Sequence, residues 1–415
     1  MRRLKWLYPG MKIKRWILTS TTGVLLVAIG SVIWILKRFP DSKAAGITVM
    51  VLGALIVIYG MKRMLKSFIA VFLPQQRERE LVDIMYHYRQ LEKGPKVVVI
   101  GGGTGLSTIL HGLKEHTSNI TAIVTVADDG GSSGRLREQF GILPPGDIRN
   151  CLVALADAEP LMRELFQFRF GSESELSGHS FGNLFITAMC KVTGDFEKAI
   201  KESSKVLAIR GRVIPSTFEK VKLVAEYQNG EKTVGETKIV KQHSPIKKVY
   251  LDPARCKASK ESFESIADAD IIVLGPGSLY TSVIPNLLVD GIAEKIAQSK
   301  APKVYVCNVM TQSGETDNYT AFEHMNVIIA HTRPDIVSYC IVNTGKVPKE
   351  FLKKYEEEGA YPVVADSDKI IENGYNVIEG DVVNIQNYVR HDTKKLSKII
   401  IDLTLKTKGK KISID

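Results

Sequence analysis

The sequence has few cysteines, and they are widely spaced. Its 415 residues include Cys151, Cys190, Cys256, Cys307 and Cys340, with no C-x-x-C pair among them. This spacing excludes a disulfide framework and a zinc ribbon. We expect all five to be small buried residues of a domain in a reducing compartment.

The chain also lacks an excess of charge beyond its N-terminal part. Residues 1–93 contain 16 Lys or Arg against 5 Asp or Glu, which accounts for the whole formal charge of +11. A strongly basic chain would suggest a nucleic-acid ligand, but here the remaining residues are neutral overall. We therefore expect no nucleic-acid partner. An apolar content of 44% excludes disordered and collagen-like chains.

Two long uncharged runs occupy the N-terminal part. Residues 16–36 and 44–61 are free of charge and are joined by KRFPDSK. Each run is long enough to cross the hydrocarbon core of a membrane, so residues 1–74 are predicted to form a helical hairpin anchor with spans at about 16–36 and 44–61. The alternative is a signal peptide followed by a buried helix, but the first run is longer than a signal peptide needs.

The flanks of these runs predict their orientation. Basic residues precede the first run and follow the second, which places both ends and the large domain in the cytoplasm. The basic and apolar segment 62–73 is expected to lie along the bilayer surface. Residues 75–94 are expected to form a polar connecting helix. The basic residues concerned are Arg2, Arg3, Lys5, Lys12, Lys14, Arg15, Lys62, Arg63 and Lys66.

From Lys96 the pattern becomes strand, glycine loop and helix. KVVVIGGGTGLSTILHGL begins with a continuous apolar run, typical of a parallel strand covered on both faces. Gly102, Gly103, Thr104 and Gly105 then open a helix whose amides suit an anion, with a tight strand-to-helix turn as the alternative. Leu106 breaks the dinucleotide fingerprint and no G-K-[ST] follows, so we expect neither a nicotinamide or flavin cofactor nor a Walker A loop.

Further polar loops follow predicted strands or open predicted helices. Because ligands bind beyond the carboxyl ends of parallel strands, these loops together predict a nucleotide or phosphate crevice. Asp147 could instead be a helix N-cap, and His179 could be a structural histidine. The candidate residues are Asp128, Asp129, Ser132, Ser133, Asp147, Arg149, Asn150, His179, Asn183, Gly275, Gly277, Ser278 and Asn308.

The segment 205–262 differs from this pattern. Its N-G dipeptide lies between alternating segments and predicts a hairpin, so we expect a small β insertion within the domain at 95–405. Residues 406–415 are expected to form a basic tail. The predicted fold is α/β, a Rossmann-like and mostly parallel sheet with helices on both faces, preceded by the two-helix transmembrane hairpin.

Long motifs in this domain resemble those of a known family. VVVIGGGTGLSTILHGL, TVADDGGSSGRLR, LPPGDIRNCLVALAD, LSGHSFGNL, GPGSLYTSVIPNLLV and CNVMTQSGETDNYTA together resemble the gluconeogenesis factor family, in the 2-phospho-L-lactate transferase (CofD-like) superfamily. The resemblance covers about residues 95–405, while the anchor departs from the shorter, soluble members. It implies a Rossmann-like fold, a nucleotide-sugar ligand, and a role in cell shape and cell-wall precursor supply during gluconeogenic growth.

The resemblance also adds residues near the C-terminus. It associates the segments of Tyr355 and Arg390 with recognition of a UDP-sugar, and it makes Thr393 a candidate phosphorylation site. A tyrosine ring can pack on a uracil or sugar, and a guanidinium can bind phosphate oxygens. Alternatively, Tyr355 has only a packing role and Arg390 is a solvated surface residue.

Two functions remain open on this basis. In the first, the protein binds a UDP-sugar such as UDP-N-acetylglucosamine and regulates envelope metabolism at the bacterial cytoplasmic membrane, together with an enzyme that makes cell-wall precursors. In the second, it is a transferase acting on a nucleotide diphosphate, with Asp128, Asp129 and Asp147 as catalytic residues and Asp128 and Asp147 holding Mg²⁺. The sequence leaves the oligomeric state open, a homo-oligomer included.

Overall fold

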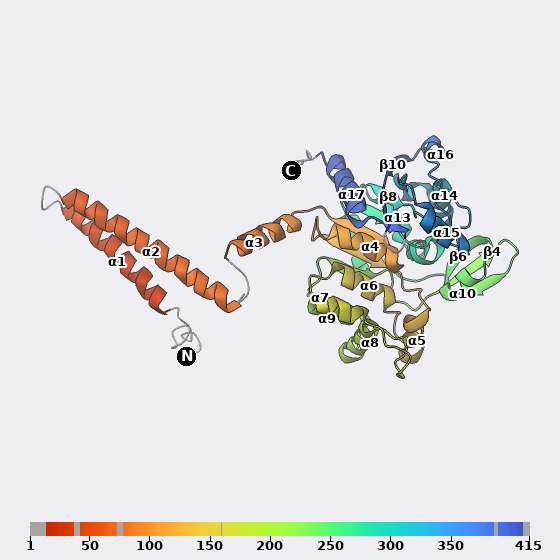
Figure 1. The fold of residues 1–415 in the computed structure, drawn as a ribbon, viewed down its shortest axis with the longest axis horizontal. Helices are drawn as coiled ribbons and strands as arrows, with labels where there is room; N and C mark the ends of the chain where they lie inside the picture. The colour runs from red at the N-terminus through yellow and green to blue at the C-terminus, as the bar shows by residue number, and fades with distance from the viewer. Residues whose placement is uncertain (1–13, 37–41, 73–77, 159, 386–388, 410–415) are drawn as a thin grey trace. The chain divides into compact units, whose positions relative to one another are not determined.

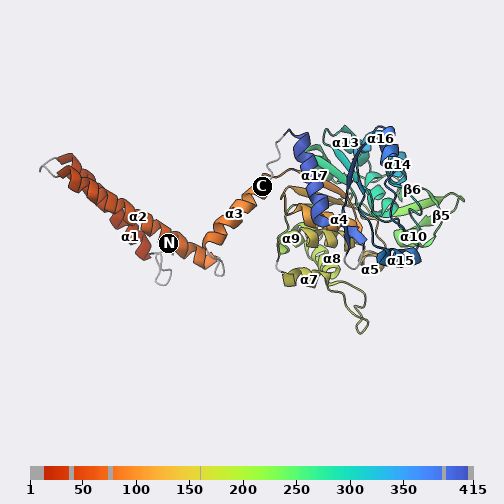
Figure 2. The same cartoon turned by 45° about the horizontal axis from the view of Figure 1, so that its top comes forward.

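The computed structural model describes residues 14–36, 42–72, 78–158, 160–385 and 389–409. The chain divides into two compact units, Met1–Arg89 and Gln90–Asp415. Figure 1 and Figure 2 show the helices of the first unit and the α/β arrangement of the second from two directions. Arg2, Arg3, Lys5 and Lys12, which carry much of the predicted orientation, lie outside the described residues, as do residues 410–415 of the expected tail.

The N-terminal unit consists of α1 (Lys14–Leu36), α2 (Ser42–Phe72) and most of α3 (Glu78–Glu92). The helices α1 and α2 are both long and apolar enough to cross a membrane. The second helix does not stop at Met61 as expected. It continues to Phe72, because the basic and apolar segment after Met61 contains no Gly or Pro that would end a helix.

The two long helices pack through glycine. A methyl group added at Gly30 would lie 2.8 Å from the carbonyl oxygen of Gly46, and one added at Gly23 would lie 2.7 Å from that of Gly53. These contacts are seven residues apart on each helix, so they recur along one face. Small residues therefore bring the two backbones together, as in membrane helix pairs.

An aromatic and basic cluster closes one end of this hairpin. The rings of Trp16 and Tyr59 meet edge to face at 6.0 Å. The Arg63 guanidinium lies 5.6 Å from the Trp16 ring centroid and donates from Nε to the Tyr59 hydroxyl at 3.2 Å. Aromatic and basic side chains of this kind gather at the interface between lipid and water.

The second unit is built on a seven-stranded sheet of order β10-β9-β8-β7-β1-β2-β3, in which all neighbouring strands are parallel. The order matches a Rossmann-type sheet with one added strand. Parallel pairing explains the continuous apolar runs, since both faces are covered. The strands are β1 (Val97–Gly101), β2 (Ile120–Val124), β3 (Arg212–Pro215), β7 (Ile271–Leu274), β8 (Lys303–Val306), β9 (Tyr339–Asn343) and β10 (Asn376–Gly380).

Alternating strand residues feed two separate cores. Val97 and Val99 point into one core, whereas Val98 and Ile100 point into the other. The first core is covered by α4 (Gly103–Leu113), α6 (Gly146–Leu155), α7 (Pro160–Gln167), α8 (Phe181–Thr193), α9 (Phe196–Val206) and α17 (Thr393–Thr407). Both views show α4 and α17 side by side.

The second core is covered by a different set of helices and turns. They are α11 (Lys260–Ala267), the π-helical turn η2 (Leu279–Val283), α12 (Ile284–Leu287), α13 (Ile292–Gln298), α14 (Ala321–His331), η3 (Pro334–Ile336) and α16 (Ser367–Glu372). The helix α5 (Gly131–Phe140) follows β2. The helix α15 (Lys349–Glu357) and the hairpin of β11 (Val383–Ile385) and β12 (Val389–His391) share a third, smaller cluster around Val309.

The β insertion is smaller than predicted. Its antiparallel sheet, of order β5-β4-β6, comprises β4 (Lys222–Tyr227), β5 (Lys232–Val234) and β6 (Ile246–Asp252), with α10 (Glu236–Lys241) between the last two. The predicted range of 205–262 was too wide, because Arg212–Pro215 pairs with β2 as the edge of the main sheet. The N-G dipeptide does form the turn between β4 and β5.

Candidate functional site

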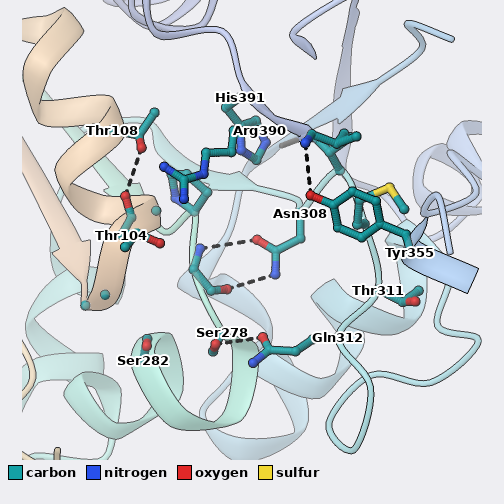
Figure 3. A pocket seen from close by; sticks show the side chains of 18 residues that line it. Thr104, Thr108, Ser278, Ser282, Asn308, Thr311, Gln312, Tyr355, Arg390 and His391 are labelled. Atoms are coloured by element: carbon teal, nitrogen blue, oxygen red, sulfur yellow. Dashed lines mark hydrogen bonds between the residues drawn. The ribbon is translucent and has the colours of Figure 1, made fainter. Parts of the chain in front are cut away.

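A cavity of about 370 Å³ opens at the carboxyl edge of the sheet, beside β1 and β7. These strands are neighbours in space, and the chain winds away from them in opposite directions, so the cavity lies at the topological switch point where α/β proteins bind ligands. Figure 3 shows the side chains that line it. They are Gly102, Gly103, Thr104, Gly105, Thr108, Pro276, Gly277, Ser278, Ser282, Asn308, Val309, Met310, Thr311, Gln312, Tyr355, Val389, Arg390 and His391.

The first wall of the cavity is the glycine loop after β1. Gly103 begins α4 with a φ of +64°, a conformation that favours glycine. A methyl group at Gly105 would lie 2.5 Å from the Pro276 carbonyl oxygen, so only a glycine lets this loop touch the loop after β7. Thr104 and Gly105 therefore present first-turn amides of α4 at the cavity, where the helix dipole favours an anion.

The loop after β7 forms the second wall and is held from behind. The Gly277 N–H donates to Asn308 Oδ1 at 3.2 Å, and Asn308 Nδ2 donates to the Gly277 carbonyl oxygen at 2.9 Å. The Gly275 N–H donates to the carbonyl oxygen of Ile100 at 2.9 Å, and Gly275 does not line the cavity. These two amides are therefore already engaged, and Ser278 lines the cavity with a hydroxyl that donates to Gln312 Oε1 at 2.7 Å.

The third wall joins two segments that are distant in the sequence. The Val389 N–H donates to the Tyr355 hydroxyl oxygen at 2.9 Å, which ties α15 to β12. Arg390 extends over the cavity toward Thr104 and Thr108 (Figure 3). His391 bonds through Nε2 to the Cys307 carbonyl oxygen at 3.1 Å, and burial lowers its pKa to about 4, so it is neutral at physiological pH.

Thr393 lies apart from this cavity. It is the first residue of α17, whose N-cap is Asp392, and it lines a neighbouring cavity of about 460 Å³ with Asn150, His111 and Arg163. Thr108 lines both cavities. The structure thus places Asn150 and Thr393 in the neighbouring cavity and not among the residues that line the cavity between the glycine loops.

Asp147 is not an N-cap, contrary to the alternative that the sequence left open. The N-cap of α6 is Pro145, and the half-buried Asp147 carboxylate accepts a hydrogen bond from the Gly103 N–H. Burial, with a smaller contribution from Asp128, raises the pKa of Asp147 to about 6. A methyl group at Gly102 would lie 2.6 Å from Asp147 Oδ2, so the carboxylate lies directly behind the first loop.

The two aspartates after β2 have different partners. Asp128 accepts from the Gly130 N–H at 2.8 Å and from the Ser133 side chain, and burial raises its pKa. Asp129 instead accepts at 3.0 Å from both the backbone and the hydroxyl of Thr237 in the insertion. Asp129 therefore anchors α10 rather than joining Asp147.

A divalent cation could occupy the space between Asp128 and Asp147. Among the described residues no group of three His, Cys, Asp or Glu side chains is arranged to hold a metal. Mg²⁺, however, commonly binds one or two carboxylates together with phosphate oxygens and water. Burial and the smaller repulsion from Asp128 raise the pKa of Asp147, and a cation would relieve that repulsion, so these two residues fit Mg²⁺ as a co-ligand of a phosphate.

The remaining predicted residues form a second polar cluster around His179. The Ser132 hydroxyl lies 3.0 Å from His179 Nδ1, and Asn183 Nδ2 donates to Ser132 Oγ at 3.1 Å. Burial, with Arg135 and Arg169, lowers the pKa of His179. Arg149 donates to Asn150 Oδ1 at 2.6 Å. None of these residues lines the cavity between the glycine loops, so the crevice predicted as one site is divided in two.

Sequence reasoning missed several lining residues. Thr108 and Ser282 each lie four residues after a predicted residue, on the same helical face, so helical spacing could have found them. Gln312 lies four residues after Asn308, in the segment that follows β8, where only Asn308 was predicted as a site residue. Glu236, on α10, does not line the cavity but lies half-buried near Asp128 and Asp147, and no local pattern marks it.

Comparisons with known proteins agree with this architecture. Residues 97–383 match the family described as 2-phospho-L-lactate transferase CofD. The chain is 48% identical to a gluconeogenesis factor of Bacillus subtilis over 74% of this chain and 98% of the relative. A crystal structure of a UPF0052 family protein from Bacillus halodurans superposes with a TM-score of 0.72 at 50% identity, covering 74% of this chain and 99% of that one.

Another relative extends into the N-terminal unit. A protein of Nostoc sp. (strain PCC 7120), also designated a gluconeogenesis factor, is 46% identical over 96% of this chain and 91% of its own length. The N-terminal unit is therefore shared with some relatives and lies outside the match to the shorter ones. From the family match and these identities, the chain belongs to the gluconeogenesis factor family within the CofD group.

Proposed function

We propose that the protein binds a nucleoside diphosphate sugar of the UDP-N-acetylglucosamine type and acts as a regulator of envelope precursor supply during gluconeogenic growth. The observation that carries the proposal is the cavity at the switch point, where first-turn amides of α4 meet Arg390 and Tyr355. Amides and a guanidinium suit a diphosphate, and a tyrosine ring suits a uracil or sugar. The gluconeogenic role rests on the names of the relatives.

The hairpin gives this proposal a location. We propose that α1 and α2 cross the cytoplasmic membrane and that the α/β domain lies in the cytoplasm, where sugar nucleotides are made. The basic residues Lys62, Arg63 and Lys66 after the second apolar run support this orientation. Protease added to intact cells should leave the domain uncut, and cleavage from outside would contradict the orientation.

Calorimetry on the full-length protein in detergent tests the ligand. Arg390→Ala should weaken UDP-N-acetylglucosamine at least tenfold, about 1.4 kcal/mol. Lys394→Ala is the matched control, since it removes an exposed positive charge four residues away and outside the cavity. Equal affinity of wild type and Arg390→Ala would remove Arg390 from the site, and absence of binding by the wild type would refute the proposed ligand.

A second candidate function is transfer from a nucleotide diphosphate. It is favoured by Asp128 and Asp147, which lie behind the first loop and fit Mg²⁺. The cation would neutralise phosphate charge, while the amides of α4 and Arg390 hold the diphosphate. Incubation with sugar nucleotides, Mg²⁺ and candidate acceptors, followed by product mass, distinguishes the two functions. Turnover that Asp147→Asn abolishes would establish the transferase, and binding without turnover supports the regulator.

The regulatory proposal includes a protein partner. An enzyme of cell-wall precursor synthesis would bind the domain when a ligand occupies the cavity, so ligand binding would control this interaction. Pull-down of such an enzyme with and without UDP-N-acetylglucosamine tests this partner, and identical capture in both conditions would contradict ligand control.

A further inference from the structure

A buried carboxylate lies beneath the second glycine loop. Glu315 is 4% exposed and does not line the cavity. Its Oε1 accepts from the Thr281 hydroxyl at 2.8 Å, and its Oε2 accepts from the Tyr280 N–H at 3.3 Å. Both donors belong to η2, the turn that begins directly after Ser278. Glu315 thus binds the start of the helical segment whose preceding loop forms the cavity wall.

A short hydrogen-bond chain connects this carboxylate to the cavity. Gln312 Nε2 lies 3.4 Å from Glu315 Oε1, and the Ser278 hydroxyl donates to Gln312 Oε1 at 2.7 Å. Ser278 and Gln312 both line the cavity, as Figure 3 shows. A change of charge on Glu315 therefore affects Gln312 directly and Ser278 through two hydrogen bonds, and both residues line the cavity in which a ligand would bind.

A tight turn fixes Glu315 in place. The Glu315 N–H donates to the Gln312 carbonyl oxygen at 3.0 Å, and the Gln312 N–H donates to the Thr316 hydroxyl at 2.9 Å. Gly314 has a φ of +82° and packs against the Val240 carbonyl oxygen of α10, where a methyl group would collide. These bonds hold the backbone of Glu315 in place, and its carboxylate is buried.

The ionisable groups around Glu315 give it no cationic partner among the described residues. On η2 the Tyr280 hydroxyl lies 3.0 Å from the Tyr319 hydroxyl, and Glu315 contributes to raising the pKa of Tyr280. On α10 the pKa of the half-buried Glu236 is raised by burial and by nearby carboxylates, Glu315 among them. Burial raises the pKa of Glu315 to about 7, despite the two hydrogen bonds from η2 that favour the charged form. A negative phosphate nearby would add to this repulsion.

We propose that Glu315 is a proton-linked positioning residue of the cavity, and that an anionic ligand at the Ser278 loop binds together with a proton on this carboxyl group. The inference rests on the proposed nucleotide-sugar function. In the charged form Glu315 places a negative charge two hydrogen bonds from the ligand, and in the neutral form it keeps the loop in place without repelling phosphate. Affinity for the ligand therefore falls as the pH rises through neutrality.

Calorimetry on the full-length protein with UDP-N-acetylglucosamine tests this coupling. Measurements in two buffers of different ionisation enthalpy give the number of protons taken up on binding. We expect net uptake by the wild type near pH 7 and an affinity that falls three- to tenfold between pH 6 and pH 8. The diphosphate of the ligand has no ionisation of its own in this range, so the uptake belongs to the protein.

Two variants separate Glu315 from the other carboxylates near the cavity. Glu315→Gln keeps the shape and mimics the neutral form, so it should bind tightly with a flatter pH profile and less proton uptake. Asp128 and Asp147 remain in this variant, so any pH dependence that they cause is retained. Glu372→Gln, which removes an exposed carboxylate on α16, should behave as the wild type.

The outcomes distinguish this inference from the function on which it rests. Ligand binding by the wild type without proton uptake near pH 7 overturns the role of Glu315, whether or not any variant folds. Unchanged uptake in Glu315→Gln overturns it as well. Failure of the wild type to bind the ligand at any pH overturns the proposed function, and this inference with it.

Discussion

The two units of this chain use apolar residues in opposite ways. In the hairpin, large apolar side chains such as Leu25 and Leu55 are more than half exposed, while Gly23, Gly30 and their partners make the contacts between helices. In the α/β domain the contacts are made by large side chains such as Ile100, which is fully buried. The difference is in line with the proposed membrane location of the hairpin, since outward leucines suit lipid and inward ones suit water.

The largest expected effect on stability comes from shortening a large apolar side chain in the core of the α/β domain. Ile100→Ala should lower the free energy of unfolding of the α/β domain by about 2–5 kcal/mol, because it leaves a cavity between strand and helices. Urea unfolding of the full-length protein in detergent, followed by circular dichroism, measures it. Leu25→Ala is the matched control in the hairpin and should leave the domain transition unchanged. An equal loss from both variants would remove the contrast between the units.

The next effect concerns the half-buried carboxylate of Asp147 in the α/β domain. The pKa of Asp147 is raised to about 6 from the ordinary 3.8, so the folded state binds the proton more tightly than the unfolded state. Its contribution to stability is thus greatest at low pH and is lost as the pH rises from about 4 to about 6. At a pH above that range, the free energy of unfolding is lower by about 3 kcal/mol than it would be if Asp147 kept its ordinary pKa in the folded state.

Asp147→Asn removes this charge. The variant should unfold at higher urea concentration than the wild type at pH 7, and at nearly the same concentration at pH 4. Glu175→Gln, at an exposed carboxylate, should shift neither value. A variant less stable than the wild type at pH 7 would show that the carboxylate, with its bond from the Gly103 N–H, stabilises the fold rather than the site.

The third prediction concerns the opposite change in the hairpin, where a large side chain replaces a glycine. Gly53→Leu should separate α1 and α2, because even a methyl group there would lie 2.7 Å from the Gly23 carbonyl oxygen. We expect a loss of about 1–3 kcal/mol, as for overpacking of a close contact. Every tryptophan in the sequence lies within residues 1–36, so tryptophan fluorescence during unfolding reports on this unit. Val51→Leu, at an exposed position, should have no effect.

The smallest expected effect lies at the third wall of the cavity. Tyr355→Phe removes the oxygen that accepts the Val389 N–H, which should cost about 1 kcal/mol and loosen β12. Hydrogen exchange of residues 389–391 should accelerate by about fivefold, while the core strands stay protected. Tyr361→Phe, at a half-exposed tyrosine, is the control. Unchanged exchange would show that the small cluster around Val309 holds this wall by itself.

Much of the architecture could be predicted from local patterns. The apolar run before Gly101 predicted β1, and the structure places it at Val97–Gly101. The glycines after β1 and β7 predicted the loops that now line the cavity. Local patterns gave wrong predictions where the same residues suit more than one role or structure. Asp147 has the position of a cap but bonds to Gly103, and the segment after Met61 has basic residues but remains helical.

The sequence by itself determined the two apolar helices, the strand–loop–helix units and the glycine loops, because each depends on residues close together in the chain. Only the tertiary structure decided that β1 and β7 are neighbours, that Tyr355 and Arg390 close the same cavity, and that the cluster around His179 lies apart from it. It also decided the charge of Asp147 and Glu315, since burial is set by elements from distant parts of the chain.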